Sequence, residues 1–305
     1  MTAKTHHNPV AMNQDYIHLL SALAQRYSEG EARAIAFLLF EEAFGVSRTD
    51  IYADKVRQFS EDEAQRLHLM CNELLQGIPV QYVLGHALFC GHSFNVTPDV
   101  LIPRPETEEL VAWTAETVSL LHVNSERPLH VLDAGTGSGC IAISLQLLLG
   151  GQAAVEACDI SSRALKVAQL NAQQLSANVH FFEYDLLQEP QPSAMPYDII
   201  VSNPPYICQS EQTDMEEHVL QHEPHTALFV PDADPQLFYR ALAHLALTWL
   251  APGGALLVEG NRAYVDETAA MFTHLGLERA DVRCDAFGNK RMVRAFRPTS
   301  TTLQH

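Results

Sequence analysis

The sequence predicts an α/β protein in which a doubly wound, mostly parallel sheet follows a helical segment. Two observations support this prediction. Up to residue 77 the apolar residues recur at helical spacing, whereas from residue 129 onward short apolar runs typical of buried strands alternate with longer helical patterns. With 305 residues, of which 47% are apolar, the chain is long enough for more than one domain.

The N-terminal segment predicts a small helical bundle. Helices are expected over 15–27 and 29–44, and another begins at the capping box Ser60-Glu61-Asp62-Glu63 and ends at Gly77. Between residues 78 and 100 the apolar residues follow a period of two, with Val80, Tyr82 and Leu84 in one run, which predicts a short β-hairpin connector. We therefore expect a helical domain over residues 12–77 and a hairpin linker over residues 78–104.

Residues 105–298 are expected to form the α/β domain, which opens with a helix over 107–121. The strands that follow are expected at 129–134, 153–159, 179–184, 197–202, 255–259, 280–284 and 292–296, and the helices at 139–149, 161–174, 235–250 and 263–275. In an open sheet of this kind the ligand lies beyond the carboxyl ends of the strands. Gly135, Asp159, Asp185 and Asn203 all fall at such ends.

The run Asn203-Pro204-Pro205-Tyr206 follows an apolar strand and predicts a site for a planar NH2 group. Asn203 supplies a side-chain oxygen, and the carbonyl of Pro204 supplies a second acceptor because neither proline carries a competing N–H. Tyr206 offers a flat face against the bound group. Two preorganised acceptors stabilise the positive charge that grows on such a nitrogen when it is methylated. The alternative is that Pro-Pro forms only a turn.

A glycine motif, Gly135-Thr136-Gly137-Ser138-Gly139, lies between a predicted strand and a predicted helix. The last glycine of the dinucleotide-binding pattern is replaced by Cys140, and the phosphate-binding pattern G-x-x-x-x-G-K-[ST] does not occur. Asp159 lies twenty residues past Gly139, where a carboxylate accepts hydrogen bonds from ribose hydroxyls. A sulfonium nucleoside, which has a ribose but no pyrophosphate, fits this pattern.

The charge and the cysteines narrow the class of protein. With 37 acidic and 19 basic residues the formal charge is −18, which disfavours binding to a phosphate backbone. The sequence shows neither a charged-then-apolar leader nor an apolar stretch of membrane-spanning length, so we expect a cytoplasmic protein without membrane contact. The six cysteines form no C-x-x-C pair and are expected to be reduced core residues.

Three further stretches complete a recognisable pattern, namely G-I-P-V-Q-Y-V-L-G at 77–85, L-I-P-R-P-E-T-E at 101–108 and E-P-H-T-A-L at 223–228. Together with the glycine motif and N-P-P-Y, they resemble the HemK/PrmC family of peptide chain release factor glutamine methyltransferases, over roughly residues 15–297. The resemblance implies a class I (Rossmann-like) S-adenosylmethionine-dependent methyltransferase domain with an N-terminal helical bundle and a β-hairpin linker. It also implies methyl transfer to the side-chain nitrogen (N5) of the glutamine in the GGQ motif of release factors, with S-adenosyl-L-homocysteine as the product.

The resemblance assigns roles to residues of this chain. The methionine part of the cofactor would lie along Gly135, Thr136, Gly137, Ser138 and Gly139, its ribose against Asp159, and its adenine beside Asp185 and Leu186. The substrate amide would be held by Asn203, Pro204, Pro205 and Tyr206, with Asn203 also bordering the cofactor. Since the helical domain carries no motif of its own, we expect it to dock the protein substrate, and we expect a monomer that makes no direct contact with nucleic acid.

Three other functions share part of this pattern. A glutamine methyltransferase of a ribosomal protein also carries N-P-P-Y, but Arg104-Pro105-Glu106 favours the release-factor enzyme because the linker of the other usually has Pro-Arg-Ser. A nucleic-acid adenine N6-methyltransferase would bring a basic target-recognition region. A catalytically silent binding module would tolerate loss of Asp159 or Asn203, and both are present.

Several other polar residues have simpler interpretations. His218, His222 and His225 could bind a metal, but Pro224 interrupts their helix and no Cys or Asp completes the set, so a solvated or substrate-lining face is expected. Glu106 and Glu108 could contact the cofactor or close the domain interface, with plain helix-start carboxylates as the alternative. Arg104 is expected to clamp nearby carboxylates, and Asp198 to orient the strand before Asn203. The segment 231–235 departs from the family pattern and receives no role.

Overall fold

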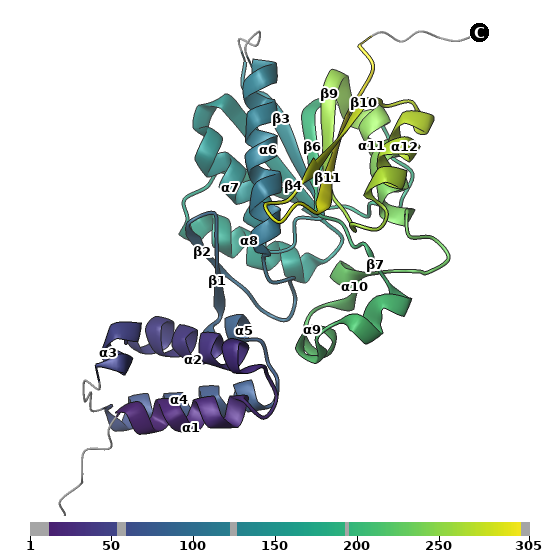
Figure 1. Cartoon of the computed structure of the whole chain (residues 1–305). Helices are drawn as coiled ribbons and strands as arrows, with labels where there is room; N and C mark the ends of the chain where they lie inside the picture. The colour runs from purple at the N-terminus through teal and green to yellow at the C-terminus, as the bar shows by residue number, and fades with distance from the viewer. Residues whose placement is uncertain (1–11, 54–58, 123–126, 193–194, 300–305) are drawn as a thin grey trace, which may run out of the picture. The chain divides into compact units, whose positions relative to one another are not determined.

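The computed structural model describes residues 12–53, 59–122, 127–192 and 195–299 (Figure 1). The chain divides into two compact units. A helical unit comprises Met1–Gly85 together with Glu217–His222, and an α/β unit comprises His86–Glu216 together with Glu223–His305. Each unit has its own buried apolar core. None of the described helices combines the length and the apolar character that crossing a membrane requires.

The helical unit contains short helices around a core that includes Leu39, Phe40 and Leu74. Its helices are α1 (Met12–Leu23), α2 (Glu29–Phe44), α3 (Arg48–Tyr52), α4 (Glu61–Leu75), α5 (Val80–Leu84) and α9 (Glu217–His222). The expected capping box at the start of α4 is present, since Glu63 Oε2 accepts the Ser60 N–H at 2.9 Å. The short helix α3 was not predicted, although Ser47 and Asp50 form a capping box at its start.

The expectation of extended structure from residue 80 to 84 is wrong, because these residues form α5. Val80, Val83 and Leu84 have the i, i+3, i+4 spacing of one helical face, and all three pack in the core of the helical unit. Gly85 ends the helix with a positive φ of 79°. Residues 80 and 84 are four positions apart, which fits both the i, i+4 spacing of a helix and a period of two. In so short a run the two patterns are therefore difficult to distinguish.

The hairpin follows directly and belongs to the α/β unit. Strands β1 (His86–Phe89) and β2 (His92–Asn95) pair antiparallel, and the two-residue turn between them has positive φ at Cys90 (48°) and Gly91 (76°). The Cys90 N–H donates to Glu108 Oε1 at 2.8 Å, and the Asn95 N–H donates to Asn171 Oδ1 at 2.7 Å. The hairpin is therefore tied to two helices of the α/β unit.

The sheet of the α/β unit has seven strands in the order β10-β11-β9-β6-β3-β4-β5. The five strands β5, β4, β3, β6 and β9 pair parallel, and β11 pairs antiparallel with both β9 and β10. The strands are β3 (Leu129–Ala134), β4 (Ala153–Asp159), β5 (Val179–Glu183), β6 (Tyr197–Ser202), β9 (Leu250–Glu259), β10 (Glu278–Cys284) and β11 (Lys290–Phe296).

Helices cover both faces of the sheet, and alternate strand residues face opposite cores. Val131 packs in one core, which the helices α6, α7 and α8 share, whereas the adjacent Leu132 packs in the other, with α11 and α12. These helices are α6 (Pro105–His122), α7 (Cys140–Leu149), α8 (Ser162–Gln174), α11 (Leu237–Trp249) and α12 (Val265–Leu275). The doubly wound sheet predicted from the sequence is confirmed.

The chain reverses its direction across the sheet at β3, because β4 and β5 lie on one side of β3, and β6 and β9 on the other. Such a switch point opens a crevice at the carboxyl ends of the strands. Short elements that were not predicted complete the unit: η1 (Gly150–Gln152), β7 (Ile207–Cys208), η2 (Gln209–Asp214), α10 (His225–Leu228) and β8 (Phe229–Val230).

Candidate active site

A cavity of about 380 Å³ occupies the crevice at the switch point. Its wall includes most of the residues that the sequence nominated, namely Gly135, Thr136, Gly137, Ser138, Asp159, Asp185, Leu186, Asn203 and Pro205. The loop before α6 adds Leu101, Pro103 and Arg104, and the start of α10 adds Pro224, Thr226 and Ala227. All of these residues belong to the α/β unit.

Three nominated residues lie outside this wall among the described residues: Gly139, Pro204 and Tyr206. Gly139 has a φ of +82°, and a Cβ there would come within 2.9 Å of Ile143 Cδ1 and 3.0 Å of Ala168 Cβ. It therefore permits α7 and α8 to pack closely. Pro204 is buried, and Tyr206 directs its hydroxyl to Glu259 Oε1 at 3.1 Å.

The glycine loop is held against the end of β4. The N–H groups of Gly135 and Thr136 both donate to the Cys158 carbonyl, at 2.8 and 2.9 Å. The next N–H, that of Gly137, donates to Asp159 Oδ2 at 2.9 Å. A Cβ added at Gly137 would meet nothing within 4 Å, so the loop presents bare backbone at this point of the cavity.

Asp159 is the acid at the end of β4. Its Oδ1 accepts the Ser161 N–H at 2.8 Å, and its Oδ2 accepts the Gly137 N–H. Burial raises the pKa of Asp159, and the backbone hydrogen bonds act in the opposite direction. Each carboxylate oxygen accepts more than one hydrogen bond, so the side chain can also take a pair of hydroxyl donors from the cavity.

Asp133, to which the sequence motifs assign no role, holds the same loop by hydrogen bonds from the protein interior. It is fully buried, and its Oδ2 accepts the Thr136 hydroxyl at 2.6 Å and the Ala142 N–H at 3.1 Å. Burial raises the pKa of Asp133 to about 7. The sequence signal for Asp133 is an acid that directly follows the apolar residues Val131 and Leu132 and precedes the first glycine by two positions.

Asn203 lies after β6, at the cavity wall. Its Nδ2 donates to Thr107 Oγ1 at 3.1 Å, and the Thr107 hydroxyl donates to Glu259 Oε2 at 2.7 Å. Thr107 and Glu259 are both buried. The sequence motifs did not assign a role to either residue. Thr107 belongs to the L-I-P-R-P-E-T-E stretch, whereas the strand that carries Glu259 shows no motif.

The other polar residues have structural partners. The expectation that Arg104 clamps a carboxylate is confirmed, because its Nη2 lies 2.6 Å from Glu223 Oε1. Asp198 lies near the start of β6, where it accepts the His130 N–H at 2.8 Å and pairs with Arg127. It therefore does not orient the Asn203 end of the strand, contrary to expectation. Within the segment 231–235, Pro231 lines the cavity.

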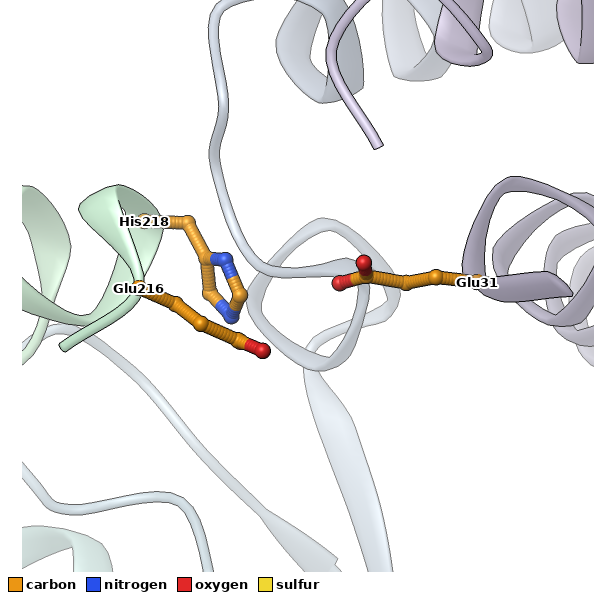
Figure 2. A group of neighbouring side chains, drawn as sticks. All are labelled: Glu31, Glu216 and His218. Atoms are coloured by element: carbon orange, nitrogen blue, oxygen red, sulfur yellow. The ribbon is translucent and has the colours of Figure 1, made fainter. Parts of the chain in front are cut away.

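The three histidines do not form one cluster within either unit, since His218 and His222 belong to the helical unit and His225 to the α/β unit. Figure 2 shows Glu31 of α2 and His218 of α9, both in the helical unit, together with Glu216, which immediately precedes α9. Glu216 belongs to the other unit and its side chain is exposed. We assign no metal to this group.

A seven-stranded sheet in this order, with a glycine loop after β3, an acid at the end of β4 and N-P-P-Y after β6, defines a class I methyltransferase. Residues 115–228 match the methyltransferase small domain, and residues 17–85 match the PrmC N-terminal domain. Both matches agree with the resemblance found in the sequence motifs.

Curated relatives cover nearly the whole chain. It is 41% identical to a release factor glutamine methyltransferase of Bacteroides thetaiotaomicron, over 94% of this chain and 100% of that protein. It is 37% identical to the enzyme of that name from Flavobacterium psychrophilum, over 90% of this chain and 95% of the relative. It is 41% identical to the enzyme of that name from Bacillus subtilis, over 69% of this chain and 72% of the relative. The chain belongs to the release factor glutamine methyltransferase family.

Proposed function

We propose that this protein transfers a methyl group from S-adenosyl-L-methionine to N5 of the glutamine in the GGQ motif of release factors, and so modulates translation termination. The observation that carries the proposal is that Asn203 and Pro205 of N-P-P-Y share one cavity with Asp159 and the glycine loop. The family relationship, which extends over most of the chain, supports the same activity.

The cavity suits the proposed cofactor by its chemistry. Its charged side chains are those of Asp99, Asp159, Asp185 and Arg104, so carboxylates outnumber the single guanidinium. Such a set favours a cationic nucleoside, and no cluster of basic side chains that would hold a pyrophosphate lines the described wall. When bound, S-adenosyl-L-methionine supplies an electrophilic methyl group on a sulfonium. Gly137, Asp159 and Asp185 with Leu186 would contact its methionine, ribose and adenine parts.

The protein's part in the reaction is to hold and polarise the amide. Asn203 Oδ1 and the Pro204 carbonyl accept the two N–H groups of the glutamine amide and stabilise the positive charge on its nitrogen. A bound S-adenosyl-L-methionine would supply the methyl group: the new C–N bond would form as the C–S bond breaks, and the electron pair of the C–S bond would remain on sulfur. One amide proton then leaves to water, so the reaction requires no side-chain base.

The proposal also covers the roles of the domains, the binding partners, the oligomeric state and the cellular location. The helical domain, residues 12–77, docks the folded release factor; residues 78–104 link it to the methyltransferase domain, residues 105–298. The enzyme acts in the cytoplasm as a monomer and binds no nucleic acid directly. The net charge of −18, which disfavours a phosphate backbone, supports the last point.

Labelled S-adenosyl-L-methionine, incubated separately with a release factor, a ribosomal protein and DNA, tests the proposed substrate. We expect label in the release factor alone. A release factor whose GGQ glutamine is replaced by alanine is the matched control and should stay unlabelled. Label in the ribosomal protein or in DNA, with none in the release factor, would refute the proposal.

A further inference from the structure

A chain of buried hydrogen bonds connects Asn203 to a carboxylate on another strand. The Asn203 amide donates from Nδ2 to Thr107 Oγ1 at 3.1 Å, and the Thr107 hydroxyl donates to Glu259 Oε2 at 2.7 Å. The second oxygen, Glu259 Oε1, accepts the Tyr206 hydroxyl at 3.1 Å. Both ends of the N-P-P-Y motif are thus tied to one carboxylate.

Three regular elements of the α/β unit meet here, namely β9, α6 and α11. Glu259 is the last residue of β9 and is 1% exposed, while Thr107 lies in the first turn of α6 and is 2% exposed. From α11, the Tyr239 hydroxyl donates to the backbone carbonyl of Glu259 at 3.2 Å. A carboxylate is costly to bury unless it is hydrogen-bonded, and here both of its oxygens have donors.

The charge state of Glu259 reflects opposing influences. The pKa of Glu259 is raised overall, with burial as the largest cause, while the hydrogen bonds from Thr107 and Tyr206 and the positive charge of Arg291 on β11 lower it. The negative charge of Glu106 on α6 acts in the same direction as burial. The contacts fit an ionised acid. Thr107 Oγ1 already accepts from Asn203 Nδ2, so its own proton is available for Glu259 Oε2, and the Tyr206 hydroxyl lies 3.1 Å from Glu259 Oε1.

An ionised carboxylate sets the direction of every hydrogen bond in this chain. It only accepts, so the single proton of the Thr107 hydroxyl is committed to Glu259. Thr107 Oγ1 then has only lone pairs to offer to Asn203, and it can pair with the NH2 end of the amide but not with the oxygen. Asn203 Oδ1 remains as the acceptor for a ligand in the cavity.

Resting on the proposed function, we infer that Thr107 and Glu259 are positioning residues that hold the Asn203 amide with its oxygen toward the substrate glutamine. If the amide turned over, its NH2 would meet the NH2 of the glutamine, and two donors cannot form a hydrogen bond. The acceptor that stabilises charge on the attacking nitrogen would be lost. Glu259 therefore contributes to the reaction without contacting the reacting atoms.

A double-mutant cycle on the full-length protein tests the inference. Thr107→Val removes the hydroxyl at similar size and should lower kcat by about tenfold or more, with little change in KM for the release factor. Thr107→Ser keeps the hydroxyl and should restore most of the activity. In an Asn203→Ala background, Thr107→Val should cause no further loss, because the amide that it positions is absent.

The matched control is Thr114→Val on the same helix. Thr114 is also fully buried, but its hydroxyl donates to the Leu110 carbonyl one turn earlier in α6. This variant should keep the wild-type kcat. If Thr107→Val lowers kcat equally in both backgrounds, or no more than Thr114→Val does, the positioning role is wrong.

A second measurement needs no substrate. In protein labelled at asparagine nitrogen, the side-chain amide signal of Asn203 is identified by its loss in Asn203→Ala. Glu259→Gln and Thr107→Val should each shift this signal, and Thr114→Val should not. An unchanged signal in both variants would overturn the inference. If one variant does not fold, as judged by its melting curve, the signal of the other variant tests the inference.

Absence of methyl transfer by the wild-type protein would count against the proposed function and not against the positioning role. The amide signal of Asn203 would still test that role.

Discussion

Arg104 Nη2 lies 2.6 Å from Glu223 Oε1, and the pair joins segments 119 positions apart in the sequence. Glu223 is buried, and its other oxygen accepts the Ile102 N–H at 3.2 Å. The segments on either side, 101–104 and 224–227, both contribute to the cavity wall. One buried carboxylate therefore holds two walls of the candidate active site together.

The first prediction follows from this contact. Glu223→Gln keeps an acceptor for Ile102 but leaves Arg104 without its charge partner, so the affinity for S-adenosyl-L-homocysteine should fall by about tenfold, near the lower end of the usual scale for hydrogen bonds to charged groups. Calorimetric titration measures it. Glu116→Gln is the control, because it removes the exposed pair with Arg283 and should have little effect. Equal affinities in the two variants would contradict the clamp.

The second prediction concerns the amide acceptor. Asn203→Ala should lower turnover on the release factor by on the order of 10²-fold or more, the usual loss for one preorganised group that stabilises a transition state. Cofactor affinity should change much less. Steady-state kinetics and titration on the same sample measure both quantities. Near-normal turnover in the variant would show that the amide is held by other groups.

The third prediction concerns the acid at the end of β4. Asp159→Ala should weaken binding of S-adenosyl-L-methionine by roughly 1.5–3 kcal/mol, the scale of hydrogen bonds to a charged group. Asp159→Asn should cost less, since one acceptor oxygen remains. The dissociation constants of both variants check the order. Unchanged affinity in Asp159→Ala would place the ribose elsewhere.

The fourth prediction is a pH dependence of stability. The pKa of Asp133 is raised to about 7, so between pH 4 and 7 the folded protein binds a proton at this site that the unfolded chain has already released. The contribution of Asp133 to stability should therefore fall as pH rises through this range and level off above it. Asparagine does not titrate, so Asp133→Asn lacks this pH-dependent loss of stability, and its melting temperature relative to that of the wild type should rise from pH 5 to 8. If the difference between the two melting temperatures stays constant over this range, the pKa of Asp133 is not raised.

The fifth prediction addresses the proposed docking role of the helical domain. Deletion of residues 1–77 should reduce methylation of intact release factor far more than cofactor binding, because remote contacts with a folded partner orient the glutamine. Both quantities are measured on one soluble truncated protein. Full activity on the intact release factor would rule the docking role out. Loss of cofactor binding to the same extent would indicate that the helices only support the fold.

The sequence by itself determined the sheet and the positions of its ligand-binding loops. The expected strands at 129–134, 153–159 and 197–202 have the observed bounds, because each is a short run rich in apolar residues that ends at or next to polar or glycine residues. The strand expected from residue 255 starts at Leu250 instead. It runs through a Pro-Gly-Gly segment that is typical of a turn, and its pairing with β6 is irregular there.

Only the tertiary structure decided which side chains support the site. Thr107 and Glu259 lie 152 positions apart and Arg104 and Glu223 lie 119 apart, yet both pairs are in hydrogen-bond contact. Local periodicity reports which face of a strand or helix is buried, but not which other segment covers that face. That choice depends on the path of the chain through the sheet. The glycine loop and N-P-P-Y could be recognised because each is contiguous in sequence, whereas their supporting carboxylates come from segments that meet only after folding.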